Sequence, residues 1–290
     1  MTQPKYFRYF RYNIDEGFDY SRVHLPDVGC VFELLEVEFK KTPSRGISCL
    51  QLIYTLQADK HLKVWIELEG ILSVFSHYDA ARFAECASAF EKKKFFLDHI
   101  RQAYMHYADQ YGWDERYFDA VYQRIVAGGI MFDRPWGNTA WDRHRKVRAR
   151  VHVHYDLDGA ELSFVIEDVK TGDVRRKVFA RWRGTNTQML NTICGKLIWE
   201  SSHRLRLYTR RSELPDYWEF DLENDRVEFH KPKAEAGDAH AQYQLGRAFL
   251  GGESGIYDLE KAVYWLRQSA AQGYKHAARF LTLMENSTPR

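Results

Sequence analysis

Apolar and polar positions alternate over much of the first 76 residues, as they do along β-strands. Two alternating runs flank the turn-like segment "QADK" at residues 57–60. We therefore expect an antiparallel β-meander over residues 29–76, in which "VFELLEVEFKK" is a first strand with a bulge at Leu34-Leu35. The two runs are expected to face each other through Leu50, Leu52, Tyr54 and Leu56 on one side and Leu62, Val64, Ile66 and Leu68 on the other.

Apolar residues then recur at helical spacing between residues 79 and 127. A long helix is predicted from Asp79 to about Gln110, and a second from Asp114 to Ala127, where two glycines end it. The next segment, "FDRPWGNTAW" at 132–141, is rich in turn formers and predicts a loop.

A second antiparallel segment is predicted over residues 146–183. Asp158-Gly159 is a strong two-residue hairpin signal, and it would place Arg150 opposite Glu167. "VRRKVFARW" predicts a third strand. A helix near 187–200 and short strands near 203–209, 216–221 and 226–230 complete residues 1–230 as an α+β domain.

The end of the chain contains an internal repeat. "AEAGDAHAQYQL" at 234–245 recurs 36 residues later as "AAQGYKHAARFL" at 270–281. Asp258 is a plausible N-cap for a helix between the two copies, and Gly273 ends that helix before another begins near Lys275. This pattern predicts a helix–turn–helix unit followed by the first helix of a next unit.

These segments, "GDAHAQYQLGRAF" and "DLEKAVYWLRQSAAQG", resemble the Sel-like repeat family over roughly residues 234–285. The resemblance implies a stub of an α-solenoid, over 234–290, of a kind that binds other proteins. A single unit cannot bury its own apolar face, so we expect it to pack on the preceding domain.

Composition narrows the class of protein. The 290 residues are 45% hydrophobic and 28% charged, which is typical of globular proteins. The net charge of +2 gives no strong positive potential that would attract nucleic acid. No apolar run has membrane-spanning length and the first residues do not resemble a signal peptide, so we expect a cytoplasmic protein without a membrane partner. The four cysteines are far apart, which favours reduced thiols over a zinc site or disulfides.

Sequence motifs for catalysis are lacking. The chain has no GxSxG, P-loop, HExxH or GxGxxG pattern, so we expect neither an enzyme nor a cofactor. His144, His152 and His154 could share a metal ion, but Arg148 and Arg150 lie on the same predicted strand face and oppose a cation. We therefore predict no metal site.

Two charged segments are candidate binding surfaces. Residues 142–150, "DRHRKVRAR", follow Trp136 and Trp141 and could bind single-stranded nucleic acid, a less favoured alternative. Residues 216–230 mix acidic and aromatic side chains, either to bind a basic protein surface or to protect an edge hairpin from aggregation. The predicted partner-binding residues, two of them from the repeat, are Asp216, Tyr217, Trp218, Glu219, Asp221, Glu223, Asp225, Tyr243 and Trp265.

A chain that joins an α+β domain without catalytic motifs to a short Sel-like repeat resembles bacterial immunity proteins, which bind a cognate polymorphic toxin and occlude its active site. The resemblance implies a non-catalytic monomer that forms a one-to-one complex with a toxin domain. A general adaptor that docks partners on its repeat is the main alternative, and a nucleic-acid-binding regulator is another.

Overall fold

The computed structural model describes residues 6–7, 9–15, 28–39, 42–43, 46–182, 187–210, 215–251 and 257–287. The chain forms two compact units, one of residues 1–132 with 155–158 and one of residues 133–154 with 159–290. The division thus falls within the segment that the sequence suggested was one domain. Helices and sheets are both present, so the α+β class is confirmed.

Unit 1 contains a four-stranded sheet in the order β2 (Tyr9–Ile14), β4 (Cys49–Thr55), β6 (Ile71–His77), β5 (Val64–Leu68). β2 and β6 both run parallel to β4, and β5 pairs antiparallel with β6. The predicted antiparallel meander over 29–76 is therefore wrong. Period-2 alternation identifies strands but not their partners, and here β6 lies between the two strands that flank residues 57–60. A short pair, β1 (Tyr6–Phe7) and β3 (Thr42–Pro43), is separate.

The segment predicted as a first strand is instead helix α1 (Gly29–Glu38). Val31, Leu34 and Leu35 are buried and stand at i, i+3 and i+4, so the apparent bulge was one face of a helix. The predicted helix from Asp79 is likewise two helices, α2 (Ala80–Ala84) and α3 (Ala89–Tyr111). Ser88 and Glu91 form a capping box that starts α3 afresh.

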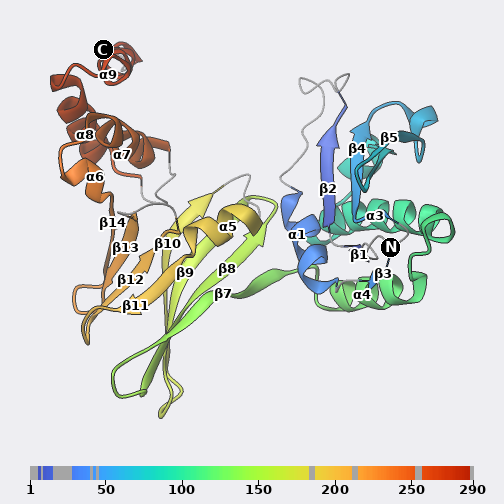
Figure 1. Ribbon diagram of the computed structural model, residues 1–290, viewed down its shortest axis with the longest axis horizontal. Coiled ribbons are helices and arrows are strands. Elements are labelled where there is room, and N and C mark those ends of the chain that lie inside the picture. Colours follow the sequence, from blue (N-terminus) through green and yellow to red (C-terminus); the bar gives the residue numbers. More distant parts are fainter. Residues whose placement is uncertain are drawn as a thin grey trace. The chain divides into compact units, whose positions relative to one another are not determined.

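Helix α4 (Glu115–Ala127) begins after Asp114, whose side chain accepts from the Tyr117 amide, as predicted. Figure 1 shows α1 and α3 beside the sheet of unit 1, and α4 packs on these two helices. An aromatic core joins these elements, in which Tyr104 stacks on Phe118 at 4.2 Å and on Trp113 at 4.8 Å between ring centroids. A short 3-10 turn (Ala58–Lys60) precedes β5.

Unit 2 begins with a sheet in the order β10 (Val174–Trp182), β9 (Gly159–Asp168), β8 (Val147–Asp156), β7 (Phe132–Trp141). The predicted loop at 132–141 is therefore wrong, because its turn-forming residues are accommodated in β7. The hairpin between β8 and β9 is confirmed, but its loop is residues 157–158 rather than 158–159. Glu167 accordingly accepts from two nitrogens of Arg148, at 2.6 and 2.8 Å, and from Arg150 at 3.2 Å.

A second antiparallel sheet follows in chain order: β11 (Lys196–Trp199), β12 (Arg204–Tyr208), β13 (Tyr217–Asp221) and β14 (Arg226–His230). Helix α5 (Thr187–Ile193) is shorter than predicted because the chain enters β11 after Gly195. A Cβ at Gly195 would lie 2.5 Å from the Tyr208 carbonyl oxygen, so any side chain at this position would clash with the backbone at the end of β12. Phe220 stacks on Phe164 at 5.8 Å and so joins this sheet to β9.

After β14, the described residues form the helices α6 (Pro232–Glu235), α7 (Ala239–Gly251), α8 (Leu259–Ala271) and α9 (Lys275–Ser287). The helix positions predicted from the repeat are confirmed, including the Asp258 cap, which accepts from the Lys261 amide. Ala234, Ala241, Leu245, Phe249 and Ala262 form one buried cluster, on which Phe229 of β14 packs. The helices are thus joined to the second sheet through apolar contact. None of the helices in the described ranges has the length and apolar character needed to cross a bilayer.

Candidate binding pocket beside the C-terminal helices

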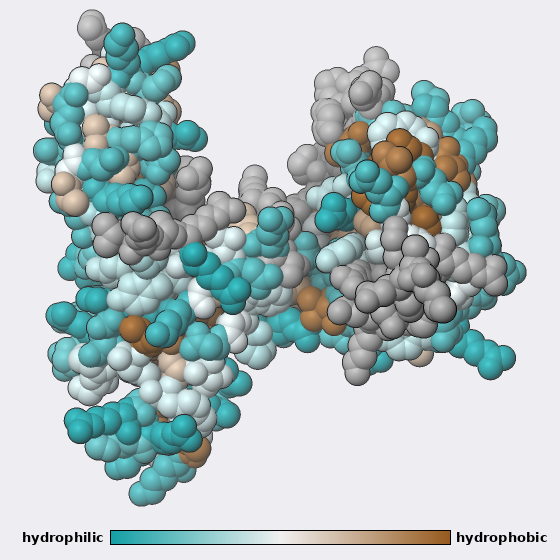
Figure 2. All heavy atoms as spheres, viewed as in Figure 1, coloured by the Kyte–Doolittle hydropathy of each residue, from teal (hydrophilic) through white to brown (hydrophobic). Residues whose placement is uncertain are grey.

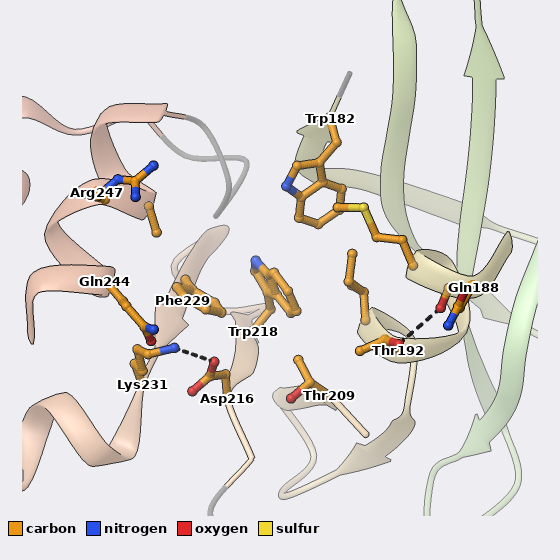
Figure 3. A pocket seen from close by; sticks show the side chains of 13 residues that line it. Trp182, Gln188, Thr192, Thr209, Asp216, Trp218, Phe229, Lys231, Gln244 and Arg247 are labelled. Atoms are coloured by element: carbon orange, nitrogen blue, oxygen red, sulfur yellow. Dashed lines mark hydrogen bonds and ion pairs between the residues drawn. The ribbon is translucent and has the colours of Figure 1, made fainter. Parts of the chain in front are cut away.

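A cavity of about 720 Å³ lies in unit 2 among α5, the strands β12–β14 and helix α7 (Figure 3). Its lining combines large aromatic side chains with hydroxyl, amide and charged groups. The lining residues are Trp182, Gln188, Met189, Thr192, Ile193, Thr209, Asp216, Trp218, Phe229, Lys231, Gln244, Arg247 and Ala248.

Three aromatic side chains form the apolar wall of the pocket. Trp218 and Phe229 stand opposite each other on β13 and β14, with ring centroids 4.7 Å apart. Trp182, at the end of β10, meets Trp218 edge-on at 5.9 Å and 84°. Because side chains alternate along a strand, Trp218 turns inward between Tyr217 and Glu219 and is almost fully buried.

Polar groups surround this wall. Lys231 donates to Asp216 at 2.8 Å, and both side chains are largely buried. The Thr192 hydroxyl donates to the carbonyl of Gln188 one turn earlier in α5. Gln244 and Arg247, three residues apart on α7, are exposed at the opposite side from α5 in Figure 3. The arrangement therefore suits an apolar or aromatic group with a polar edge.

The structure places only two of the predicted acidic and aromatic strip residues, Asp216 and Trp218, in this pocket. The strip also supplies Phe229, which was not among the predicted binding residues. Most of the strip's other carboxylates have partners within unit 2. Glu219 accepts from Arg206 at 2.6 Å, and Asp225 pairs with Arg175 and Lys177.

These interactions have electrostatic consequences. Hydrogen bonds from Lys177 and Arg175 lower the pKa of Asp225. Hydrogen bonds from Asn224 lower the pKa of Asp221, which closes the β13–β14 turn. Glu223 lies 3.5 Å from His203 and is 68% exposed, so it is the strip carboxylate best placed to meet a partner's charge.

The remaining predicted residues are packed within unit 2. Tyr217 stacks on His230 with ring centroids 4.7 Å apart, and burial raises the pKa of Tyr217. Tyr243 contacts the ring of Tyr274 at 5.2 Å, and Trp265 packs against the buried cluster of the helices. The pocket does not include these three residues.

Sequence reasoning missed Trp182, Gln188, Thr192, Gln244 and Arg247 as pocket residues. They come from three segments, and only the fold brings those segments together. One signal was available, since Gln244 and Arg247 lie one turn apart on the repeat helix and each is followed by an apolar residue, Leu245 and Ala248.

The basic strip at 142–150 borders a second cavity of about 910 Å³ in unit 2. Trp141, Arg143, His144 and Trp199 are among its lining residues. Arg148 and Arg150 are not, and both pair with Glu167. The positive charge of residues 142–150 is therefore partly neutralised by Glu167 of the same sheet.

The histidines considered for a metal ion interact with a carboxylate instead. Nδ1 of His152 lies 2.9 Å from Asp133, and Nδ1 of His154 lies 3.9 Å from it. Burial lowers the pKa of His152. Across the described ranges, no group of three or more His, Cys, Asp or Glu side chains is placed to hold a metal ion.

Fold and site together define an α+β protein whose C-terminal helices complete an aromatic, polar-rimmed pocket against a β-sheet. Comparison with protein-family models, with curated proteins and with solved structures found no match to this chain.

Proposed function

We propose that the chain is a non-catalytic protein-binding protein, and specifically an immunity protein that neutralises a cognate bacterial toxin. One observation carries the proposal. Asp216 and Trp218 of the acidic, aromatic strip line the same pocket as Gln244 and Arg247 of the repeat-like helix α7. Two segments that independently suggested partner binding thus contribute to one site.

The chemistry of the pocket indicates how a partner would bind. An apolar or aromatic side chain of the toxin would rest on Phe229, the half-buried ring of the wall, behind which the buried Trp182 and Trp218 are packed. Gln244 and Arg247 would hydrogen-bond the surrounding backbone and acidic groups. Because the Lys231–Asp216 pair is already formed, it adds polarity without exposing an unpaired charge.

The acidic strip would contribute mainly to association rate. Glu219 and Asp225 already have cationic partners within the chain, so reversing them would disturb folding as well as binding. Glu223 is the cleaner test of electrostatic steering towards a basic toxin cleft, and its effect should decrease as salt increases.

The experiment is co-expression with the product of each gene that neighbours the one for this chain, followed by co-purification and, for a product that is toxic alone, a toxin activity assay. Arg247→Glu should weaken the complex about tenfold, as expected when an interface cation is reversed. Arg279→Glu, the same charge change at an exposed position of α9, is the matched control and should bind like the wild type. A toxin that stays fully active with excess protein would refute the immunity proposal, and stable binding without inhibition would favour the general adaptor.

Nucleic-acid binding is a second candidate, favoured by the aromatic and basic lining of the 910 Å³ cavity. If it were correct, a single-stranded oligonucleotide would quench Trp fluorescence in a salt-dependent way, and Trp141→Ala would remove most of that change. Pairing of Arg148 and Arg150 with Glu167 makes this the weaker proposal.

A further inference from the structure

Strand β5 presents an apolar surface at the edge of the unit 1 sheet. Val64, Trp65, Ile66 and Leu68 are 45%, 57%, 42% and 59% exposed. In Figure 2, hydrophobic residues gather at the surface where Figure 1 places β5. Within the described residues, β5 is a terminal strand of its sheet and pairs with β6. An exposed apolar edge of this kind is a template for another strand.

The strand is held in place by helix α3. The Tyr111 hydroxyl donates to Glu67 at 2.7 Å, and the Tyr107 hydroxyl donates to the carbonyl of Leu62. At its other end, Glu69 and Gly70 both have positive φ, 52° and 86°, and form the two-residue turn into β6. Because β5 is already ordered, a partner strand would not have to offset the entropy of ordering it.

We propose that β5 pairs antiparallel with β5 of a second copy of this chain, centred on Ile66. In this register Val64 of one copy lies opposite Leu68 of the other, and Lys63 lies opposite Glu69. The same register places Trp65 opposite Glu67. A twofold axis produces each pair twice, so the charges at the two ends of the paired edge are complementary. A bulge between Val64 and Ile66 shortens the regular part of the strand, and the two terminal ion pairs would help fix the register.

Neighbouring registers are less favourable. Centring the pairing on Glu67 would place that carboxylate opposite its own copy, and like charges directly opposite each other are destabilising. Centring it on Trp65 would direct Lys63 towards Glu67, which already accepts from Tyr111. The register on Ile66 brings Lys63 to Glu69, and both residues are exposed. Lys63 lies 3.9 Å from Asp59 within its own chain, but a pair so exposed contributes little and does not hold Lys63 there.

The proposed dimer differs from the monomer that the sequence analysis expects. It is formed by unit 1 and does not use the pocket of unit 2, so its failure would leave the proposed function standing.

The test is sedimentation equilibrium of the full chain from low to high micromolar concentration. The wild type should dimerise, and Ile66→Lys should be monomeric throughout, with an unchanged circular dichroism spectrum because Ile66 is exposed. Lys63→Glu and Glu69→Lys should each weaken the dimer about tenfold by placing like charges opposite each other. The double variant Lys63→Glu/Glu69→Lys should recover wild-type association, and Arg116→Glu on α4 is a control that should not change it.

Three results would overturn the proposal: a wild type that is monomeric at every concentration, a dimer that Ile66→Lys leaves intact, or a charge swap that does not restore association. A wild-type monomer would indicate that the edge is solvated or receives a strand from another protein. A dimer insensitive to Ile66→Lys would place the interface elsewhere.

Discussion

Gly246 determines how closely α7 approaches α8. A Cβ at this position would lie 2.7 Å from Cγ of Leu266 and 3.0 Å from the carbonyl of Ala262. The two helices therefore pack at a distance that only glycine permits. This is the physical role expected of the small residues in the repeat, and it can be tested independently of any family assignment.

We predict that Gly246→Ala destabilises unit 2 by about 1–3 kcal/mol, the usual cost of overpacking. In an ordinary helix interior the same change would be stabilising by up to about 1 kcal/mol, so the sign alone is informative. Chemical denaturation of Gly246→Ala, of Leu266→Ala and of the double variant would measure the coupling. Additive effects would contradict a direct contact between these positions.

Two ionisable groups in unit 1, the half-buried Glu36 and the buried His99, make stability depend on pH in opposite directions. Burial, reinforced by the nearby charge of Glu33, raises the pKa of Glu36 from 4.5 to about 7, although the Phe10 amide donates to it. Burial, with His61 nearby, lowers the pKa of His99 from 6.5 to about 4. Glu36 therefore favours the folded state when protonated, and His99 favours it when neutral.

The signs follow from proton linkage. Between about pH 4.5 and 7 the folded state retains a proton on Glu36 that the unfolded chain releases, so this group's contribution to stability falls as pH rises. We predict that Glu36→Gln stabilises the protein at pH 8 by about 1 kcal/mol, after allowance for the solvent that reaches the carboxyl. His99→Gln should have its effect at acid pH, where it should remove the loss of stability that His99 causes as the pH falls from 6.5 to 4. Melting curves at pH 5 and pH 8 would measure both, and a Glu36→Gln variant less stable at pH 8 would contradict the prediction.

At the scale of elements, the sequence was informative where a periodic pattern also had a local end signal. Helix α4 was predicted to begin at Asp114, and α8 was predicted with Asp258 as its N-cap. In both helices the carboxylate accepts from the amide three residues later. Helix α1 was missed because its N-cap residue, Val28, makes no side-chain cap and because its apolar positions fit two periods.

Pairing between elements was less predictable. The parallel arrangement of β2, β4 and β6 depends on connections through residues far apart in sequence, which alternation does not encode. The pocket had the same limitation. Asp216 and Trp218 could be identified from the sequence as binding residues of one segment. Trp182 and Arg247 come from β10 and α7, and only the packing of these elements on the same sheet brings them to the pocket.

At the scale of the whole molecule, the C-terminal helices belong to the compact unit that also contains the sheets β7–β10 and β11–β14. Phe229 of β14 packs on the buried cluster of α6, α7 and α8, and Trp218 stands beside it on β13. The helices therefore cover part of the second sheet, and they also form one wall of the candidate pocket. Their loss should affect stability and partner binding together.

We predict that removing residues 234–290 lowers both the solubility and the unfolding midpoint of the remaining chain. The truncation deletes Leu245 and Phe249 from the buried cluster and exposes Phe229, and burial of one such aromatic side chain contributes about 1.5–3 kcal/mol. Removing residues 275–290 is the control, because it deletes α9 and keeps every member of that cluster, so its effect should be smaller. Differential scanning calorimetry and solubility measurements on the three lengths would decide. A soluble chain ending at residue 233 with the wild-type midpoint would contradict the prediction. It would show that the helices fold independently and that the second sheet is stable without α7.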